Sequence, residues 1–67
     1  MKISEKLFKL RTENRLTLLQ LSRGANVAVG ALCDIENGKH LPSIATLLKL
    51  SRFYDVNIYD LLGENSK

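Results

Sequence analysis

Cysteine, proline and tryptophan are nearly missing from this sequence. The chain has 67 residues, with one cysteine, one proline and no tryptophan. A lone Cys33 cannot form a disulfide framework or a clustered cysteine metal site within one chain. We therefore expect no metal or other cofactor, and a reducing compartment.

Long apolar runs and catalytic constellations are missing as well. The start, MKISEKLFKL, places charges where a signal peptide carries its apolar stretch, and no run approaches the length of a membrane span. We expect a cytoplasmic protein with no membrane partner. The single histidine, His40, has no evident partner for catalysis, and no nucleophile–base pair or carboxylate dyad is apparent. The sequence therefore predicts no enzyme and no small-molecule substrate.

The composition that is present describes a small globular domain. Hydrophobic residues make up 45% and charged residues 25% of the chain, whereas disorder needs a lower apolar fraction. At this length we expect one domain over residues 1–67 with a thin core. The net charge of +3 is compatible with a polyanionic partner, as it is with many small soluble domains.

Helical periodicity predicts two helices in the first part of the chain. The apolar positions of the first, over residues 3–14, are Ile3, Leu7, Phe8 and Leu10. Thr17 followed by Gln20 matches a capping box, so a second helix begins at Thr17. Its buried side takes Leu21 with either Leu18 or Leu19. Asn26, which tolerates a left-handed conformation, ends this helix or forms the turn after it.

A third helix is predicted over residues 28–36. Ala28, Leu32 and Ile35 recur at helical spacing, which predicts that they pack inward. The outward positions are then Val29, Gly30, Cys33, Asp34 and Asn37. Gly38 is expected to close the helix as a left-handed cap.

Two more helices follow the only proline, Pro42. Ser43 is a suitable N-cap, and the predicted inward face of the fourth helix consists of Ile44, Leu47, Leu48, Leu50, Ser51 and Tyr54. Asn57 with Asp60 can cap a last short helix, which Gly63 ends, and residues 64–67 are expected to fray. No stretch alternates strictly, so the sequence predicts an all-α protein of five helices.

Two charges lie on apolar helix faces. Arg11 is one turn beyond Leu7, and Glu36 is one turn beyond Leu32. A charge in such a place is costly unless it is paired, so Arg11 and Glu36 either meet or extend separately to solvent.

The segment LTLLQLSRGANVAVGALCDIENGKHLPSIATLLKL, residues 16–50, resembles the Cro/repressor-type helix-turn-helix family, also called the XRE family. The match extends from about Ile3 to Leu62. The resemblance implies a five-helix, lambda-repressor-like DNA-binding domain with its helix-turn-helix over about residues 17–36 and its third helix in the major groove. It also implies that Arg11 and Glu36 form a buried pair.

The resemblance further implies which residues contact DNA. Base-contacting positions are Ala28, Val29, Gly30 and Asp34. The phosphate-contacting positions are Asn37 and Lys39, together with the amide ends of the second and fourth helices at Thr17, Leu18 and Ser43. Further candidates are Arg15, Arg23 and His40. The alternative for all these charged residues is a solvated surface.

The reading face departs from the family pattern. Val29, Gly30 and Cys33 supply no strong side-chain hydrogen bonds, and phosphates repel Asp34. Leu18 stands where family members usually have glutamine. Direct readout is limited to thymine methyl groups against Ala28 and Val29 and a cytosine amino group donating to Asp34. We therefore expect shallow specificity, or specificity carried by groove shape.

Two functions remain open at this stage. The first is a transcriptional regulator, a repressor, that binds an inverted-repeat operator in double-stranded DNA as a homodimer; its candidate dimer surface is Phe53, Tyr59 and Leu62. The second is a protein-interaction module, an antirepressor or partner subunit, that uses the apolar third helix as its contact. The ENGK segment and the basic charge balance favour DNA binding.

Overall fold

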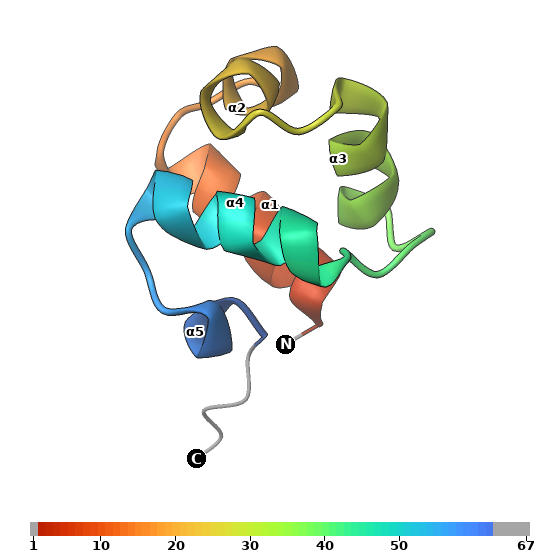
Figure 1. Ribbon diagram of the computed structural model, residues 1–67. Helices are drawn as coiled ribbons and strands as arrows, with labels where there is room; N and C mark the ends of the chain where they lie inside the picture. Colours follow the sequence, from red (N-terminus) through yellow and green to blue (C-terminus); the bar gives the residue numbers. More distant parts are fainter. Residues whose placement is uncertain (1, 63–67) are drawn as a thin grey trace.

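Five helices account for most of the chain. The computed structural model describes residues 2–62 and contains α1 (Ile3–Glu13), α2 (Leu18–Ala25), α3 (Val29–Glu36), α4 (Ile44–Tyr54) and α5 (Ile58–Leu62) (Figure 1). Residues 2–62 contain no strand. The predicted all-α, five-helix fold is confirmed. Gly63 and the expected fraying of residues 64–67 lie outside the described residues.

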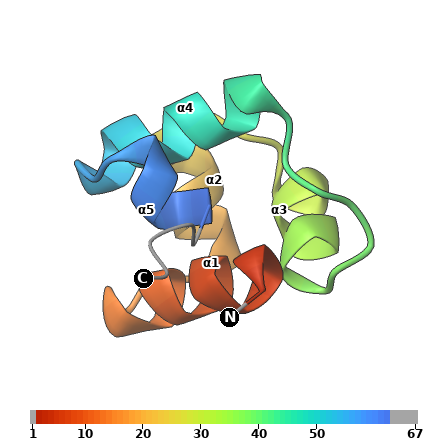
Figure 2. The same ribbon diagram turned by 90° about the horizontal axis from the view of Figure 1, so that it is seen from below.

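The helices enclose one core. α2 packs against α3 and α4, α1 packs against α3 and α5, and α4 packs against α5. Figure 2, seen from below, shows α5 between α4 and α1, with α3 at one side of the molecule. The core residues are Leu7, Leu21, Ala25, Val27, Leu32, Ile35, Leu47, Leu50 and Leu61. Each helix contributes to this set, so no helix is dispensable for burying the apolar side chains.

Side chains near each helix start explain where three of the helices begin. The Thr17 hydroxyl accepts from the Gln20 amide at 3.0 Å, and Gln20 Oε1 accepts from the Thr17 amide at 2.9 Å, which confirms the capping box. Ser43 Oγ accepts from the Thr46 amide at 3.1 Å. Asn57 Oδ1 accepts from the Tyr59 amide at 2.8 Å. These bonds satisfy amides that have no partner inside the helix.

Left-handed residues end or separate the helices. Asn26 has φ 60° and Gly38 has φ 78°, as the sequence predicts for both. Arg15 and Asp55 are also left-handed, with φ 58° and 56°, and were not predicted. Asp is among the residue types that tolerate this region, whereas Arg15 is there because the chain must turn sharply between α1 and α2.

Three predicted helix faces are too wide, because some positions on each are exposed while the others are buried or partly buried. Phe8, Ile44 and Leu48 are exposed rather than inward, with Ile44 at 67%. Ala28 is an exposed N-cap with φ −58° and ψ 137°, not a packed helical residue. Periodicity finds the apolar positions but cannot say how wide a stripe the neighbouring helices cover. In α2, Leu18 rather than Leu19 packs on the core.

Candidate nucleic-acid interface

The turn between α2 and α3 is held by Ser22. Its hydroxyl donates to the Val27 carbonyl at 2.6 Å, while the Val27 amide donates to the Ser22 carbonyl at 3.1 Å. Val27 is buried, and Asn26 before it supplies the left-handed residue. Together these contacts fix the angle between α2 and α3. Sequence reasoning missed the roles of both residues, whose only signal was their position near Asn26: Val27 follows it directly and Ser22 lies one helical turn before it.

The outer face of α3 carries few polar groups. Leu32 and Ile35 face the core, while Val29 is 43% exposed and Gly30 is exposed beside it. A Cβ atom added at Gly30 would meet nothing within 4 Å, so packing does not require glycine there. Ala28 has no side-chain capping bond. The four predicted base-contacting positions are therefore at the surface, with Asp34 partly exposed, and Asp34 is their one polar side chain.

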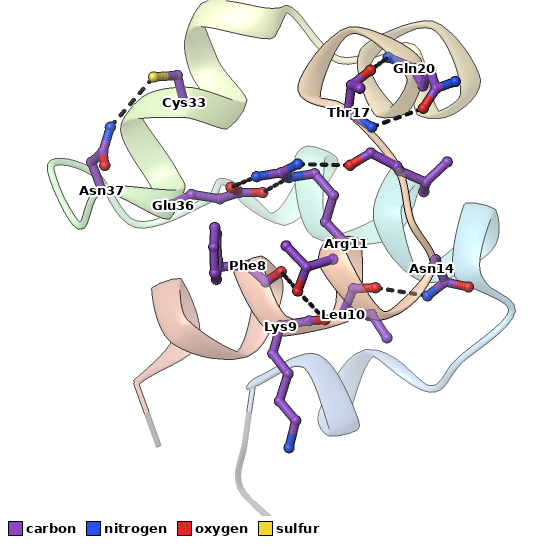
Figure 3. A network of polar contacts seen from close by, with 12 residues as sticks. Phe8, Lys9, Leu10, Arg11, Asn14, Thr17, Gln20, Cys33, Glu36 and Asn37 are labelled. Carbon is purple, nitrogen blue, oxygen red and sulfur yellow. Dashed lines mark hydrogen bonds and ion pairs between the residues drawn. The ribbon is translucent and has the colours of Figure 1, made fainter.

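The loop after α3 brings polar groups beside its C-terminal end. Asn37 is exposed and its Nδ2 donates to Cys33 Sγ at 3.4 Å (Figure 3). The Lys39 amide donates to the Asp34 carbonyl at 2.9 Å, and Lys39 is exposed. Asn37 and Lys39 therefore lie on the same loop next to the exposed face of α3.

The starts of α2 and α4 offer main-chain amides to an anion. Thr17 and Ser43 are both exposed N-caps. The Thr17 hydroxyl is engaged in the capping box, so the amides in the first turn of α2 are the groups available to a ligand. Leu18 packs its side chain on the core, so it can contribute only its amide.

A groove of about 610 Å³ lies between the start of α1 and the loop after α3. Its lining includes the charged residues Lys2, Glu5 and Lys39, and also His40. Lys2 and Glu5 belong to the start of α1, more than thirty residues before Lys39 in the chain, so spacing along the sequence gave no signal that they lie together. The groove therefore contains a second lysine, Lys2, in addition to Lys39.

Arg11 and Glu36 form a paired, almost buried contact. Arg11 Nε and Nη2 donate to the two Glu36 carboxylate oxygens at 2.8 and 2.9 Å, and Arg11 Nη1 donates to the Leu16 carbonyl at 2.7 Å (Figure 3). The exposed fractions of the two side chains are 13% and 8%. The alternative of two separate solvated charges is wrong. The bonds to Glu36 raise the pKa of Arg11, and they join α1 to the end of α3.

Two aromatic rings lie beside this pair. The Arg11 guanidinium carbon is 5.4 Å from the centre of the Phe8 ring, which is the range of a cation–π contact. Among the described residues, the Tyr54 hydroxyl is a buried polar group without a hydrogen-bond partner. Burial, and then the Glu36 carboxylate, raise the pKa of Tyr54 to about 12.

This arrangement defines a helix-turn-helix domain that presents α3 to solvent. Residues 7–61 match the family described as Helix-turn-helix, and the chain belongs to that family. The sequence resemblance to XRE-type regulators is confirmed.

Three proteins illustrate the similarity. The chain is 39% identical over 92% of its length to the HTH-type transcriptional regulator DdrOP3 of Deinococcus deserti, covering 48% of that protein. It is 29% identical over 98% of its length to the immunity repressor protein of Bacillus phage phi105, covering 46% of that protein. It also matches a crystal structure of SinR, the master regulator for biofilm formation, in complex with DNA. That match has a TM-score of 0.83 and 34% identity, over 90% of this chain and 97% of that one.

The chain spans about half the length of these two curated relatives. None of the helices within residues 2–62 has the length and apolar character needed to cross a bilayer. The same residues hold no group of three or more His, Cys, Asp or Glu side chains that could bind a metal ion.

Proposed function

We propose that this chain binds double-stranded DNA as the DNA-binding domain of a transcriptional regulator, with α3 in the major groove. The observation that carries the proposal is the exposed outer face of α3, together with the exposed helix starts at Thr17 and Ser43 and the exposed loop residues Asn37 and Lys39. The SinR structure in complex with DNA, and the regulator and repressor names of the curated relatives, support it. The function is binding rather than catalysis.

In this proposal α3 reads bases with a small set of groups. Ala28, Val29 and Gly30 approach the base edges, where the two apolar side chains contact thymine methyl groups. Asp34 accepts a hydrogen bond from a cytosine amino group. Since none of these residues makes the bidentate contacts of arginine, asparagine or glutamine, sequence preference is shallow and groove shape contributes to it.

The phosphate contacts in this proposal come from main-chain and polar groups around α3. Thr17 and Leu18 contribute the amide end of α2, and Ser43 contributes that of α4. Asn37 and Lys39, on the loop between α3 and α4, bind the DNA backbone. These contacts provide most of the affinity and make it depend on salt, because bound cations release counterions from DNA.

We further propose that the regulator acts as a homodimer and represses transcription from an inverted-repeat operator. Half-sites of such dimers lie about 34 Å apart. Tyr59 and Phe53 are exposed and Leu62 is partly exposed, so these residues offer an apolar surface outside the reading face. A sedimentation experiment with Tyr59→Ser tests the surface: the variant is expected to remain monomeric at concentrations where the parent associates.

The experiment that tests DNA binding is selection of bound duplexes from a random pool, followed by titration of the enriched sequence. Lys39→Ala is expected to weaken binding to every duplex several-fold and to reduce the salt dependence, whereas Val29→Ala is expected to change the preference among sequences. A control titration at low salt uses a random duplex. Equal effects of both substitutions on every probe would contradict the proposed roles.

The second candidate function is a protein-interaction module that uses the outer face of α3. Val29 and Gly30 are exposed, and exposed apolar surface often marks a protein contact. This function predicts negligible binding to a random duplex even at low salt, where the electrostatic part of DNA binding is strongest. The same titration therefore separates the two functions.

A further inference from the structure

Asp34 is the acidic side chain of α3 that faces outward and makes no bond to Arg11. The other acid of this helix, Glu36, is bonded to Arg11 and faces inward. The Asp34 side chain is 39% exposed on the face proposed to meet DNA. A carboxylate in this position is repelled by phosphates, so its presence at a reading position needs a compensating group.

The loop after α3 supplies that group by folding back along the helix. Gly38, with φ 78°, turns the chain, and the Lys39 amide donates to the Asp34 carbonyl at 2.9 Å. His40 follows directly, and its Nε2 lies 3.6 Å from Asp34 Oδ2. The path of the main chain therefore brings His40 next to Asp34.

We propose that His40 is a positioning residue for Asp34, holding its carboxylate at the outer face of α3, where Asp34 selects a cytosine in each half-site. This inference rests on the proposed DNA-binding function. A carboxylate only accepts hydrogen bonds, and the cytosine amino group only donates. With the imidazole beside Oδ2, the other carboxylate oxygen, Oδ1, accepts from the base. The nearby imidazole N–H offsets the repulsion between the Asp34 carboxylate and the DNA phosphates.

The competing interpretation is a solvated contact with no consequence. The separation of 3.6 Å exceeds a direct hydrogen bond, and the His40 side chain is 68% exposed. Exposed pairs of this kind contribute little to folding stability. The two interpretations therefore differ in base preference rather than in folding stability. If the pair is only a solvated contact, removing His40 leaves the preference at the base pair read by Asp34 unchanged.

The test begins with the duplex that the parent chain enriches from a random pool. Selection with Asp34→Ala identifies the base pair that Asp34 reads: it is the position of the duplex at which the variant's base preference is reduced. Competition between that duplex and one with this pair replaced then measures the preference for the parent, His40→Ala, His40→Gln and the control Lys39→Ala. Thermal unfolding of each variant checks that the fold is retained.

Asp34→Ala is expected to reduce the preference at its position about tenfold, within the usual discrimination of a base contact. His40→Ala is expected to reduce the preference at the same position about two- to fivefold and to leave other positions unchanged. His40→Gln, which keeps a donor at similar reach, is expected to retain most of it. Lys39→Ala is expected to lower all affinities alike.

Two outcomes overturn the inference while leaving DNA binding intact. If His40→Ala weakens all duplexes by one factor, or changes nothing, His40 is a phosphate contact or a solvated residue. If the parent enriches a sequence but Asp34→Ala leaves its profile unchanged, Asp34 reads no base. A parent chain that retains no duplex at low salt contradicts the proposed function itself and the inference with it, so the two failures are distinguishable.

Discussion

The two faces of α3 differ in how completely their groups are bonded. On the inner side, Glu36 binds Arg11 with both carboxylate oxygens, and Leu32 and Ile35 are buried. On the outer side, Val29 and Gly30 are exposed, and Asp34 has only the long contact to His40. The inner face of α3 is thus bonded and buried and fixes the position of the helix, whereas the outer face is exposed and can contact a ligand. Stability and recognition can therefore be altered separately.

The largest effect is expected at the inner side. Arg11→Met leaves the buried Glu36 carboxylate without its partner, and removing one member of a buried pair costs about 3–5 kcal/mol. Urea unfolding followed by circular dichroism measures the loss. The double variant Arg11→Met/Glu36→Leu is the control and is expected to recover a large part of it, because no charge is then left buried. An unchanged midpoint for Arg11→Met would show that the pair is a surface contact.

The next effect is at Gly24 of α2, which lies against Phe53 of α4. A Cβ at Gly24 would clash with Phe53 Cε1, so Gly24→Ala forces the ring to move. Overpacking of this kind costs about 1–3 kcal/mol. Adding Phe53→Leu to Gly24→Ala is expected to restore part of the stability in the same unfolding measurement. If Gly24→Ala is neutral, the ring moves freely and does not fix α4 against α2.

Gly30→Ala is the matched substitution on the outer face, with the opposite expected sign. A Cβ there meets nothing within 4 Å, and alanine is favoured over glycine in a helix by up to about 1 kcal/mol. The thermal midpoint of Gly30→Ala is therefore expected to rise slightly. A lower midpoint would indicate that this face is packed against something, such as a second copy of the chain.

The last effect is confined to high pH and concerns Tyr54, beside the Arg11–Glu36 pair. Burial raises the pKa of Tyr54 to about 12 from an unfolded value of 10.0, so the folded state holds its proton more tightly. The resulting stability is present below pH 10 and is lost as pH rises toward 12. Tyr54→Phe is expected to unfold with a shallower pH dependence between these values. Parallel curves for the parent and Tyr54→Phe would show that the hydroxyl is solvated.

Local features of the fold were readable from the sequence because their partners are close along the chain. The Thr17–Gln20 capping box spans three residues, and Asn26 and Gly38 occupy left-handed turns that favour their residue types. Helix type and number follow from periodicity for the same reason.

Features that depend on packing between distant segments were not readable. The outward position of Ile44 and Leu48 depends on how much of α4 its neighbours α2 and α5 cover, and no pattern within α4 encodes that. For Arg11 and Glu36 the sequence left two alternatives, which only the crossing of α1 and α3 decides. The contact of His40 with Asp34 depends on a loop whose path spacing does not give.

The open space around Gly30 has a consequence for how such a regulator changes its target. A Cβ atom introduced at this position meets no neighbour, so the first atom of any new side chain displaces nothing. Under the proposed function, a polar side chain at this position would change the base preference by a single substitution, before any compensating change elsewhere in the chain.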